Sequence, residues 1–273
     1  MRTEIANNIN EFLRIIHKTE NFENNWYRGQ RFSEYQLEPS LFRDKEEVIT
    51  GDGYIQFRSY KFKDEEGALK TFKKEYSKLN DTKGFDEIHF LYLMQHHDIR
   101  TRLLDFSLNP LIALYFSVEA KNKVDKDEED NYFKYKSQMY DFNKESSAVF
   151  AINPSIVNKY SINTEKIFDL SNYKYSSLKN INFPICIKPR NKNLDKRLIS
   201  QNGVFVYFGK EVHPLDYYSI QEQNILKIII PNSKREKIKR ELKSKFNIYH
   251  STIYPDMKGI TLEVNETLNK KYK

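Results

Sequence analysis

A polar segment enclosed by two apolar segments constrains the fold of this chain more than any other feature. Residues 95–106 contain two histidines, two arginines, two aspartates and one threonine, with the apolar runs Phe90–Met94 before them and Asn109–Phe116 after them. A buried polar group without a partner costs roughly 1–3 kcal/mol, so the fold has to supply partners for these side chains. The segment therefore predicts either a functional site or a structural polar network, and the sequence leaves both interpretations open.

The apolar pattern predicts an α+β fold. The 273 residues suffice to bury the core of one domain, and we expect a single domain over 1–273. Apolar side chains recur at helical spacing at 5–18, 62–79, 85–97, 109–119 and 232–246. Strand-like runs lie at 148–153, 184–188, 203–208 and 224–231. We therefore predict helices in the N-terminal half and a mainly antiparallel sheet formed largely by the C-terminal half, with a polar excursion at 121–147.

Composition excludes several classes of protein. The single cysteine, Cys186, rules out an intramolecular disulfide framework and a four-cysteine zinc site. The net charge of +7 comes from 45 basic and 38 acidic residues whose signs are mixed, which favours a solvated lysine-rich surface over a nucleic-acid interface. No segment approaches the ~20 apolar residues of a membrane span, and the N-terminus lacks the apolar core of a signal peptide. We expect a cytoplasmic protein with no membrane partner.

An arginine near the N-terminus is the first candidate for a binding residue. Tyr27-Arg28-Gly29 ends a short predicted strand at 24–28. An arginine followed by a conformationally free residue can direct its planar guanidinium at a carboxylate or a phosphate. The alternative is a strand-end arginine that pairs with a structural carboxylate.

The central polar segment supplies further candidates. His96 and His97 are adjacent, so on a helix they diverge by about 100° and cannot share a metal ion; we expect no metal site. Arg102 and Asp105 can pair with each other, or Asp105 can orient a histidine or an arginine. Later in the chain, Gln201 offers both a donor and an acceptor, which suits either an amide, a base edge or the cap of a strand.

Together these segments resemble the FRG domain family, named after its Phe/Tyr-Arg-Gly motif. The motif is Tyr27-Arg28-Gly29 here, and residues 37–43 resemble the Leu-x-Pro-Ser-Leu-x-Arg that follows it. Residues 95–107 resemble Gln-His-Tyr-Gly-Leu-Pro-Thr-Arg-Leu-Leu-Asp-Trp-Thr, and 109–116 resemble Asn-Pro-Leu-x-Ala-Leu-x-Phe. Later likenesses extend the expected match from about 24 to 262: Arg197…Gln201-Asn202-Gly203-Val204-Phe205, and 251–259 with Ser-x-Leu-Phe-Pro-Asp-Leu-x-Gly. Asp98 and Arg100 replace the Gly and Pro of the pattern, which predicts a differently shaped turn.

The resemblance implies a polar pocket assembled from distant motifs. A weaker likeness to ADP-ribosyltransferases of the Arg-Ser-Glu type implies that the pocket binds a nucleotide, NAD, as a substrate. The expected cofactor-binding residues are Tyr27, Arg28, Gly29, Arg43, Thr101 and Arg102, and the expected catalytic residues are His96, Asp105 and Gln201. Gln201 stands where those enzymes have their catalytic glutamate.

Three functions follow as hypotheses. The first is a nucleotide-binding, ADP-ribosyltransferase-like or NAD glycohydrolase-like enzyme with a protein or nucleic-acid target, in phage defence or toxin action as the resemblance implies. The second is a nucleic-acid-binding or nucleic-acid-modifying module. The third is a non-enzymatic sensor or interaction domain whose polar segment is architectural.

Overall fold

The fold is taken from a computed structural model. It describes residues 1–19, 24–43, 46–49, 55–58, 62–119, 146–169, 175–178, 180–189, 196–211, 213–217 and 224–271. The polar excursion predicted at 121–147 lies outside the described residues, apart from its last two, Ser146 and Ser147. None of the described helices is long and apolar enough to cross a membrane.

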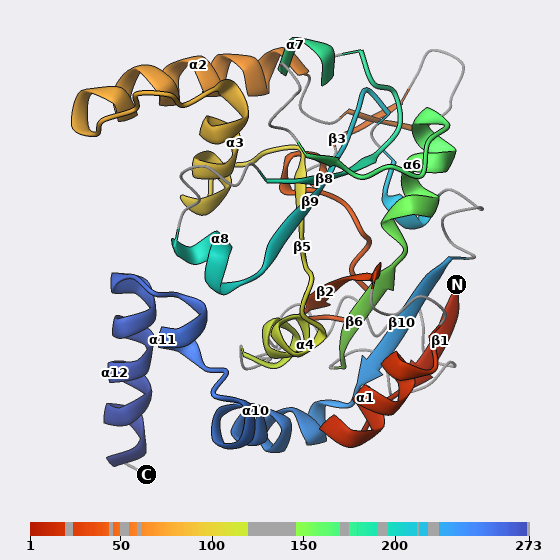
Figure 1. Ribbon diagram of the computed structural model, residues 1–273, viewed down its shortest axis with the longest axis vertical. Helices are drawn as coiled ribbons and strands as arrows, with labels where there is room; N and C mark the ends of the chain where they lie inside the picture. Colours follow the sequence, from red (N-terminus) through yellow and green to blue (C-terminus); the bar gives the residue numbers. More distant parts are fainter. Residues whose placement is uncertain are drawn as a thin grey trace.

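The described residues form one large, mainly antiparallel sheet in the order β1-β10-β6-β2-β5-β9-β8-β7 (Figure 1). Only β1–β10 and β7–β8 are parallel among the described pairs of this sheet. Its strands are β1 (Arg2–Ile5), β2 (Trp26–Gln30), β5 (Leu103–Ser107), β6 (Ser147–Ile152), β7 (Phe168–Asp169), β8 (Ile185–Lys188), β9 (Gly203–Tyr207) and β10 (Ile225–Ile230). A separate hairpin joins β3 (Glu46–Ile49) to β4 (Ile55–Arg58).

The predicted α+β class is confirmed, although the two halves of the chain are more interleaved than expected. The N-terminal half supplies three strands of the large sheet, β1, β2 and β5. The described helices are α1 (Ile9–His17), α2 (Phe62–Leu79), α3 (Glu87–His96), α4 (Pro110–Val118), α6 (Pro154–Ile162), α7 (Tyr175–Leu178), α8 (Lys196–Ser200), α10 (Asn232–Phe246), α11 (His250–Ile253) and α12 (Met257–Lys271). Helices therefore occur in both halves.

The first helix starts later than its apolar pattern predicts. Ile5 belongs to β1 and pairs with Ile229 of β10. Asn8 ends the strand-like conformation and caps α1, because its Oδ1 accepts a hydrogen bond from the backbone N–H of Glu11 at 2.9 Å. The apolar pattern at 5–18 thus includes Ile5, the last residue of β1, as well as the residues of α1.

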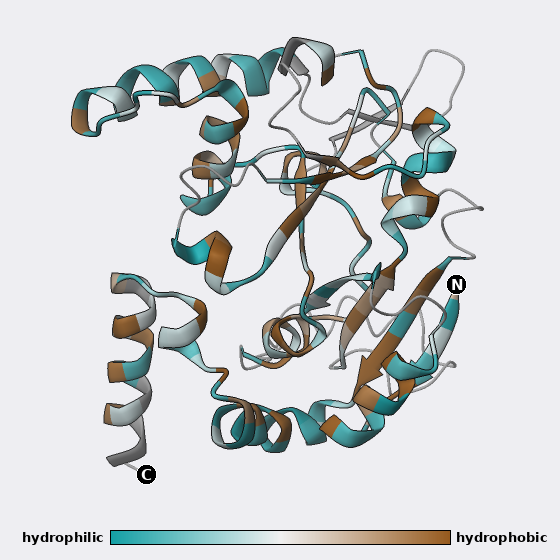
Figure 2. Cartoon of the chain, viewed as in Figure 1, coloured by the Kyte–Doolittle hydropathy of each residue, from teal (hydrophilic) through white to brown (hydrophobic). Residues whose placement is uncertain are grey.

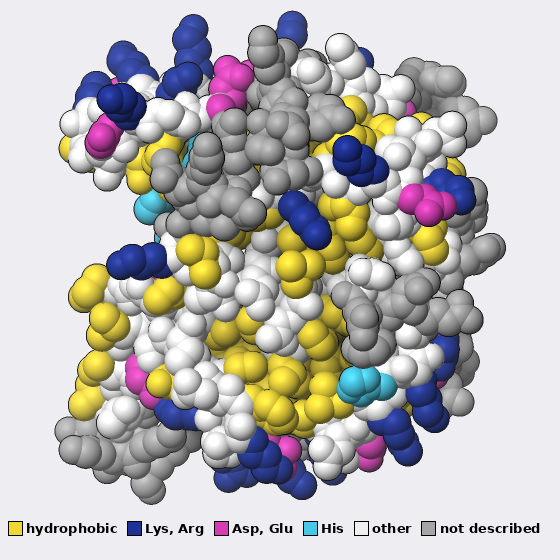
Figure 3. All heavy atoms as spheres, viewed as in Figure 1, with side chains coloured by type: hydrophobic (Ala, Val, Ile, Leu, Met, Phe, Trp, Pro, Cys, Tyr) yellow, Lys and Arg dark blue, Asp and Glu magenta, His cyan; other side chains and the backbone are white. Residues whose placement is uncertain are grey.

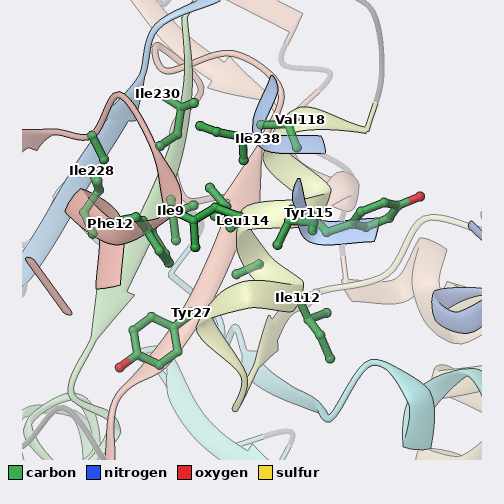
Figure 4. Close-up of a cluster of buried hydrophobic side chains, with 14 of the residues drawn as sticks. Ile9, Phe12, Tyr27, Ile112, Leu114, Tyr115, Val118, Ile228, Ile230 and Ile238 are labelled. Carbon is green, nitrogen blue, oxygen red and sulfur yellow. The ribbon is translucent and has the colours of Figure 1, made fainter. Parts of the chain in front are cut away.

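Two groups of helices cover one face of the sheet. Helices α1, α4 and α10 pack on β2, β6 and β10 in the cluster drawn in Figure 4, which includes Tyr27 and Ile228. Helices α2 and α3 pack on β5, β8 and β9 in a second cluster that includes Leu103. Tyr27 lies opposite Ser107 in the β2–β5 ladder, and residues two apart on a strand share a face, so both clusters lie on the same face. Figure 1 shows the two helix groups at opposite ends of the sheet.

The other face carries a third apolar cluster. Trp26, Phe150 and Phe208 belong to it, together with Leu37 and Leu41 of the loop before β3. The strands β5, β6, β8, β9 and β10 are consequently buried over most of both faces, and Figure 2 shows many of their residues as hydrophobic. Cys186 lies within this cluster and is fully buried, as its apolar neighbours predict.

The sheet opens between its two central strands. Of the described residues in β2 and β5, only Tyr27 and Ser107 are register partners, whereas β2 and β6 pair over five positions. The opening lies between the two helix groups. This is the place where a cavity can reach the backbone of the central strands.

Candidate functional site

A cavity of about 470 Å³ lies over the central strands, between the two helix groups. Its size is within the usual range for small-molecule sites. Six of the nine predicted site residues line this cleft: Tyr27, Arg28, Gly29, His96, Asp105 and Gln201. They come from four separate segments of the chain, so the fold brings together most of what the sequence indicated.

Arg28 bridges the opening between β2 and β5. Its Nη1 donates a hydrogen bond to the backbone carbonyl of Asp105 at 2.8 Å, where the ladder between the two strands has ended. Its Nε is buried and makes no hydrogen bond with the described residues. Burial lowers the pKa of Arg28 to about 10, and the charge of Arg43 lowers it further, while the Asp105 carboxylate acts in the opposite direction. Arg28 thus contributes a cation to the cleft lining, and its buried Nε is a donor without a hydrogen bond among the described residues.

Gly29 is required where it stands because α4 lies directly on β2. A Cβ atom at this position would collide with the Ala113 carbonyl and the Ser117 backbone nitrogen. The close approach brings the C-terminal end of α4 to the cleft. Tyr27, next to Arg28, is buried among the apolar residues below α4, and burial raises its pKa to about 12.

Asp105 is the exposed residue in the middle of an otherwise buried strand. Its Oδ2 accepts a hydrogen bond from Gln95 Nε2 at 2.9 Å, and Gln95 Oε1 accepts one from Thr101 Oγ1 at 2.5 Å. A carboxylate only accepts hydrogen bonds, so the amide nitrogen of Gln95 faces Asp105 and its oxygen faces Thr101. Thr101 is fully buried and lies outside the cleft, so it acts on Asp105 through Gln95.

His96 reaches the cleft from the last residue of α3. Its Nε2 lies 3.8 Å from Asp256 Oδ2, and its backbone carbonyl accepts a hydrogen bond from Arg197 Nη1 at 3.2 Å. His97 is exposed and lies 6.2 Å, ring centre to ring centre, from both Phe72 and Tyr76. His96 thus lines the cleft and His97, the C-cap of α3, is exposed, although their ring centres lie only 5.0 Å apart.

Gln201 joins the turn before β9 to the segment before α12. Its Nε2 donates to the Ile253 carbonyl at 3.3 Å, and Ser200 Oγ donates to the same oxygen at 2.9 Å. The Gln201 carbonyl accepts a hydrogen bond from Ser107 Oγ at 2.7 Å. Gln201 therefore holds two walls of the cleft together.

Glu119 and Tyr254 also line the cleft, and neither was among the predicted site residues. The Tyr254 hydroxyl donates to both carboxylate oxygens of Glu119, at 3.0 and 2.9 Å, and the guanidinium carbon of Arg197 lies 4.5 Å from the centre of the Tyr254 ring. Tyr254 and Arg197 belong to segments that carry the family resemblance, which was an available signal. Glu119 follows an apolar helix, and no motif marks it.

Aromatic rings form another wall of the cleft. Tyr92 stacks on Phe205 with ring centres 4.6 Å apart, and Phe85 stacks on His89 at 4.9 Å. All four residues line the cavity. The cleft thus combines charged and amide groups with flat apolar surfaces.

Arg102 and Arg43 lie outside the cleft lining. Arg102 is buried, and its guanidinium pairs with Glu65 of α2. Arg43 is exposed, and its Nη2 lies 3.4 Å from the Glu38 carbonyl that accepts its hydrogen bond. The loop that holds Arg43 packs against Thr101, whose carbonyl accepts a hydrogen bond from Leu41 N at 3.2 Å. The structure thus gives these three predicted residues interior or peripheral positions.

The turn after α3 keeps the shape that a glycine would give it. Asp98 adopts φ +59°, the left-handed conformation that glycine usually supplies after a helix. The expectation of a differently shaped turn is therefore not met at Asp98, because aspartate tolerates this conformation better than most residues.

Comparisons with known proteins support one family. The family model of the FRG domain matches residues 23–126. No curated protein and no solved structure matches the chain. The expected extension of the match to residue 262 stays a prediction. Among the described residues, no group of three or more His, Cys, Asp or Glu side chains could hold a metal ion. The chain contains an FRG domain, and this domain supplies Arg28, His96 and Asp105 to the cleft.

Proposed function

We propose that the cleft binds a nucleotide, NAD, and that the chain transfers or hydrolyses its ADP-ribose unit. The observation that carries this proposal is the convergence of Arg28, His96, Asp105 and Gln201, which are far apart in the sequence, on one cavity of about 470 Å³. A charged network that served only to hold the fold would not need an open cavity.

Arg28 is suited to the diphosphate. A guanidinium presents donors in a planar fork that matches phosphate oxygens, and the Nε of Arg28 is a buried donor without a hydrogen bond. Arg197 adds a second cation to the lining. The Asp105 carboxylate, held by Gln95, favours the charged form of Arg28, and the Asp105 backbone carbonyl accepts a hydrogen bond from the Arg28 guanidinium.

The aromatic wall is suited to the rings of a nucleotide. Flat heterocycles bind against exposed aromatic faces and edges, and such contacts contribute about 1–3 kcal/mol per base in nucleic-acid complexes. Tyr92 and Phe85, the half-buried members of the two stacked pairs, offer such surfaces next to the polar groups. His96 would orient the ribose or activate an acceptor from the end of α3.

The surface argues less for the nucleic-acid alternative. On the face in Figure 3, lysine and arginine side chains are scattered around the rim and mixed with acidic ones, whereas a nucleic-acid interface usually gathers basic residues in one stripe. For the third hypothesis, the buried Arg102–Glu65 pair supports an architectural role for Arg102 alone. A target that is a protein or a nucleic acid would suit phage defence or toxin action.

The test is a thermal-shift titration with NAD, ADP-ribose and ATP, followed by an assay for nicotinamide release. A ligand that binds only the folded protein raises the unfolding midpoint. We expect NAD and ADP-ribose to raise it, and Arg28→Ala to weaken binding roughly 10- to 100-fold, the value of a charge-assisted hydrogen bond.

Arg14→Ala removes an exposed arginine of α1 outside the cleft and serves as the control. Equal nucleotide affinity in Arg28→Ala and Arg14→Ala would refute the proposed role of Arg28. Binding without nicotinamide release would favour the sensor hypothesis. A lack of binding by any nucleotide would refute the proposal as a whole.

A further inference from the structure

Glu119 occupies a position that does not favour the fold. It directly follows the last residue of α4 and takes the C-cap position of that helix. The C-terminal end of a helix carries a partial negative charge, so it repels a carboxylate. A cation would stabilise α4 better, so the reason for a glutamate has to be sought elsewhere than in the helix.

The structure holds this carboxylate at the cleft. Both of its oxygens accept from the Tyr254 hydroxyl, and both residues line the cavity. Tyr254 is only 8% exposed and is fixed from two sides, by the Arg197 guanidinium over its ring and by Gly259, whose Cα lies so close to the Tyr254 carbonyl that a Cβ would collide with it. Burial is the largest of the effects that raise the Tyr254 pKa, so its hydroxyl keeps its proton as a donor.

Glu119 and Asp105 belong to different electrostatic surroundings within the cleft. Asp105 acts on Arg28, and Glu119 acts on Tyr254 together with Asp98 and Arg197. Asp105 is therefore engaged at the arginine that would hold phosphates, where a second carboxylate function would repel the ligand. Asp98 and Glu119 are the other carboxylates of the lining, and Glu119, held by the Tyr254 hydroxyl, is suited to a neutral, hydroxyl-bearing part of the ligand.

We infer that Glu119, positioned by Tyr254, hydrogen-bonds the terminal ribose hydroxyls of ADP-ribose. It supplies a carboxylate for this role, for which the turn before β9 has only the amide of Gln201. The inference rests on the proposed nucleotide-binding function and narrows its substrate class. The ligand is a nucleotide with a second sugar beyond its diphosphate, and simple nucleoside diphosphates fill only the Arg28 part of the cleft. Vicinal hydroxyls are donors, and a carboxylate can accept from both of them.

The experiment compares the affinities of ADP and ADP-ribose, which differ by that second ribose, by isothermal titration calorimetry. The wild-type protein is expected to prefer ADP-ribose by roughly 10- to 100-fold, as for a hydrogen bond to a charged group. Glu119→Ala is expected to abolish the preference and to leave ADP affinity unchanged, which also shows that the variant is folded. Glu87→Ala, which removes an exposed carboxylate outside the cleft, is the control and keeps the preference.

The outcomes separate the inference from the function on which it rests. Equal affinity of the wild type for the two ligands, or a preference that survives in Glu119→Ala, overturns the inference and leaves the proposed function standing. Failure of the wild type to bind either ligand overturns both. If Glu119→Ala no longer binds ADP, then Glu119→Gln, which keeps the volume and an acceptor for Tyr254, takes its place; a reduced preference supports the inference and an unchanged one overturns it.

Discussion

Arg102 and Glu65 form an ion pair that is closed to solvent, with Arg102 Nε 2.5 Å from Glu65 Oε2 and side-chain exposures of 1% and 0%. Glu65 Oε1 also accepts a hydrogen bond from the backbone N–H of Arg102 at 2.9 Å. The pair joins α2 to Arg102, which directly precedes β5 and lies three residues before Asp105 in the chain. Within the polar segment at 95–106, Arg102 therefore has a structural role, whereas His96 and Asp105 line the cleft.

Breaking this pair should destabilise the folded protein. Arg102→Ala leaves the Glu65 carboxylate buried without its partner, and the loss of one member of a buried pair typically costs about 3–5 kcal/mol. We expect a decrease of that size in the free energy of unfolding, measured by urea denaturation with an unchanged slope.

The same experiment has an internal control. The double variant Arg102→Ala/Glu65→Ala should be destabilised by less than the sum of the two single variants, because the second change removes the stranded charge. Lys78→Ala breaks an exposed pair with Glu75 on α2 and should leave stability unchanged. Additive effects at 102 and 65 would show that the two residues do not act as a pair.

Two glycines should respond to alanine with opposite signs. Gly29→Ala places a methyl group on the backbone of α4, and overpacking of this kind typically costs about 1–3 kcal/mol. Gly67 lies in α2 with no atom near the position of its Cβ. Gly67→Ala should therefore stabilise the protein by about 0.5–1 kcal/mol through helix propensity. Thermal unfolding of both variants checks the pair; a neutral Gly29→Ala would contradict the close packing of α4 on β2.

The left-handed turn after α3 predicts a difference between two variants of Asp98. Asp98→Gly and Asp98→Ala both remove the carboxylate, so lost side-chain interactions cancel in their comparison. Only alanine is strained at φ +59°, by about 1–2 kcal/mol. The glycine variant should be the more stable of the two by about that amount in urea denaturation, and equal stabilities would argue against the left-handed conformation.

The sequence predicts the elements of this fold better than it predicts which side chains meet. Strong patterns fix α4, α10 and β10, because each is set by local apolar spacing or by a cap such as Asn109, whose Oδ1 accepts from Leu111 N. The interleaving of the strands is not local: β5 pairs with β9, about a hundred residues later. A pattern of single residues carries no information about such distant neighbours.

The candidate site shows the same limit. Arg28 and Asp105 were identifiable because unusual polar residues stand in apolar surroundings. Arg102 had the same signature, and only the position of α2 shows that Glu65 takes it into the interior. Conversely, Glu119 stands among ordinary surface charges in the sequence, and its place in the cleft depends on the docking of α11. Tertiary contacts thus decide which of several residues with similar sequence surroundings lie in the cleft and which lie in the interior.

The desolvated charge of Arg28, which we assign to ligand binding, should lower the stability of the fold. Its guanidinium is largely desolvated, and its Nε makes no hydrogen bond with the described residues. Arg28→Met keeps the volume and removes a largely desolvated charge, whose burial costs free energy in the wild type. We expect the variant to be at least as stable as the wild type, by up to about 1 kcal/mol, because one hydrogen bond to Asp105 is lost and Arg28 remains partly exposed. Its affinity for ADP-ribose should fall roughly 10- to 100-fold, as in Arg28→Ala.

The pH dependence of that difference follows from the direction of the Arg28 pKa shift. Burial lowers the pKa of Arg28 to about 10 in the folded protein. The protonated guanidinium is therefore less favourable in the folded state than in the unfolded state. The unfolded state binds more protons only as the pH rises through about 10, and there the wild type gains stability relative to Arg28→Met. Between pH 6 and 8 the arginine is charged in both states, so the stability difference should be constant. Thermal unfolding of both proteins across this range checks the prediction, and a difference that changes between pH 6 and 8 would mean that another group titrates with Arg28.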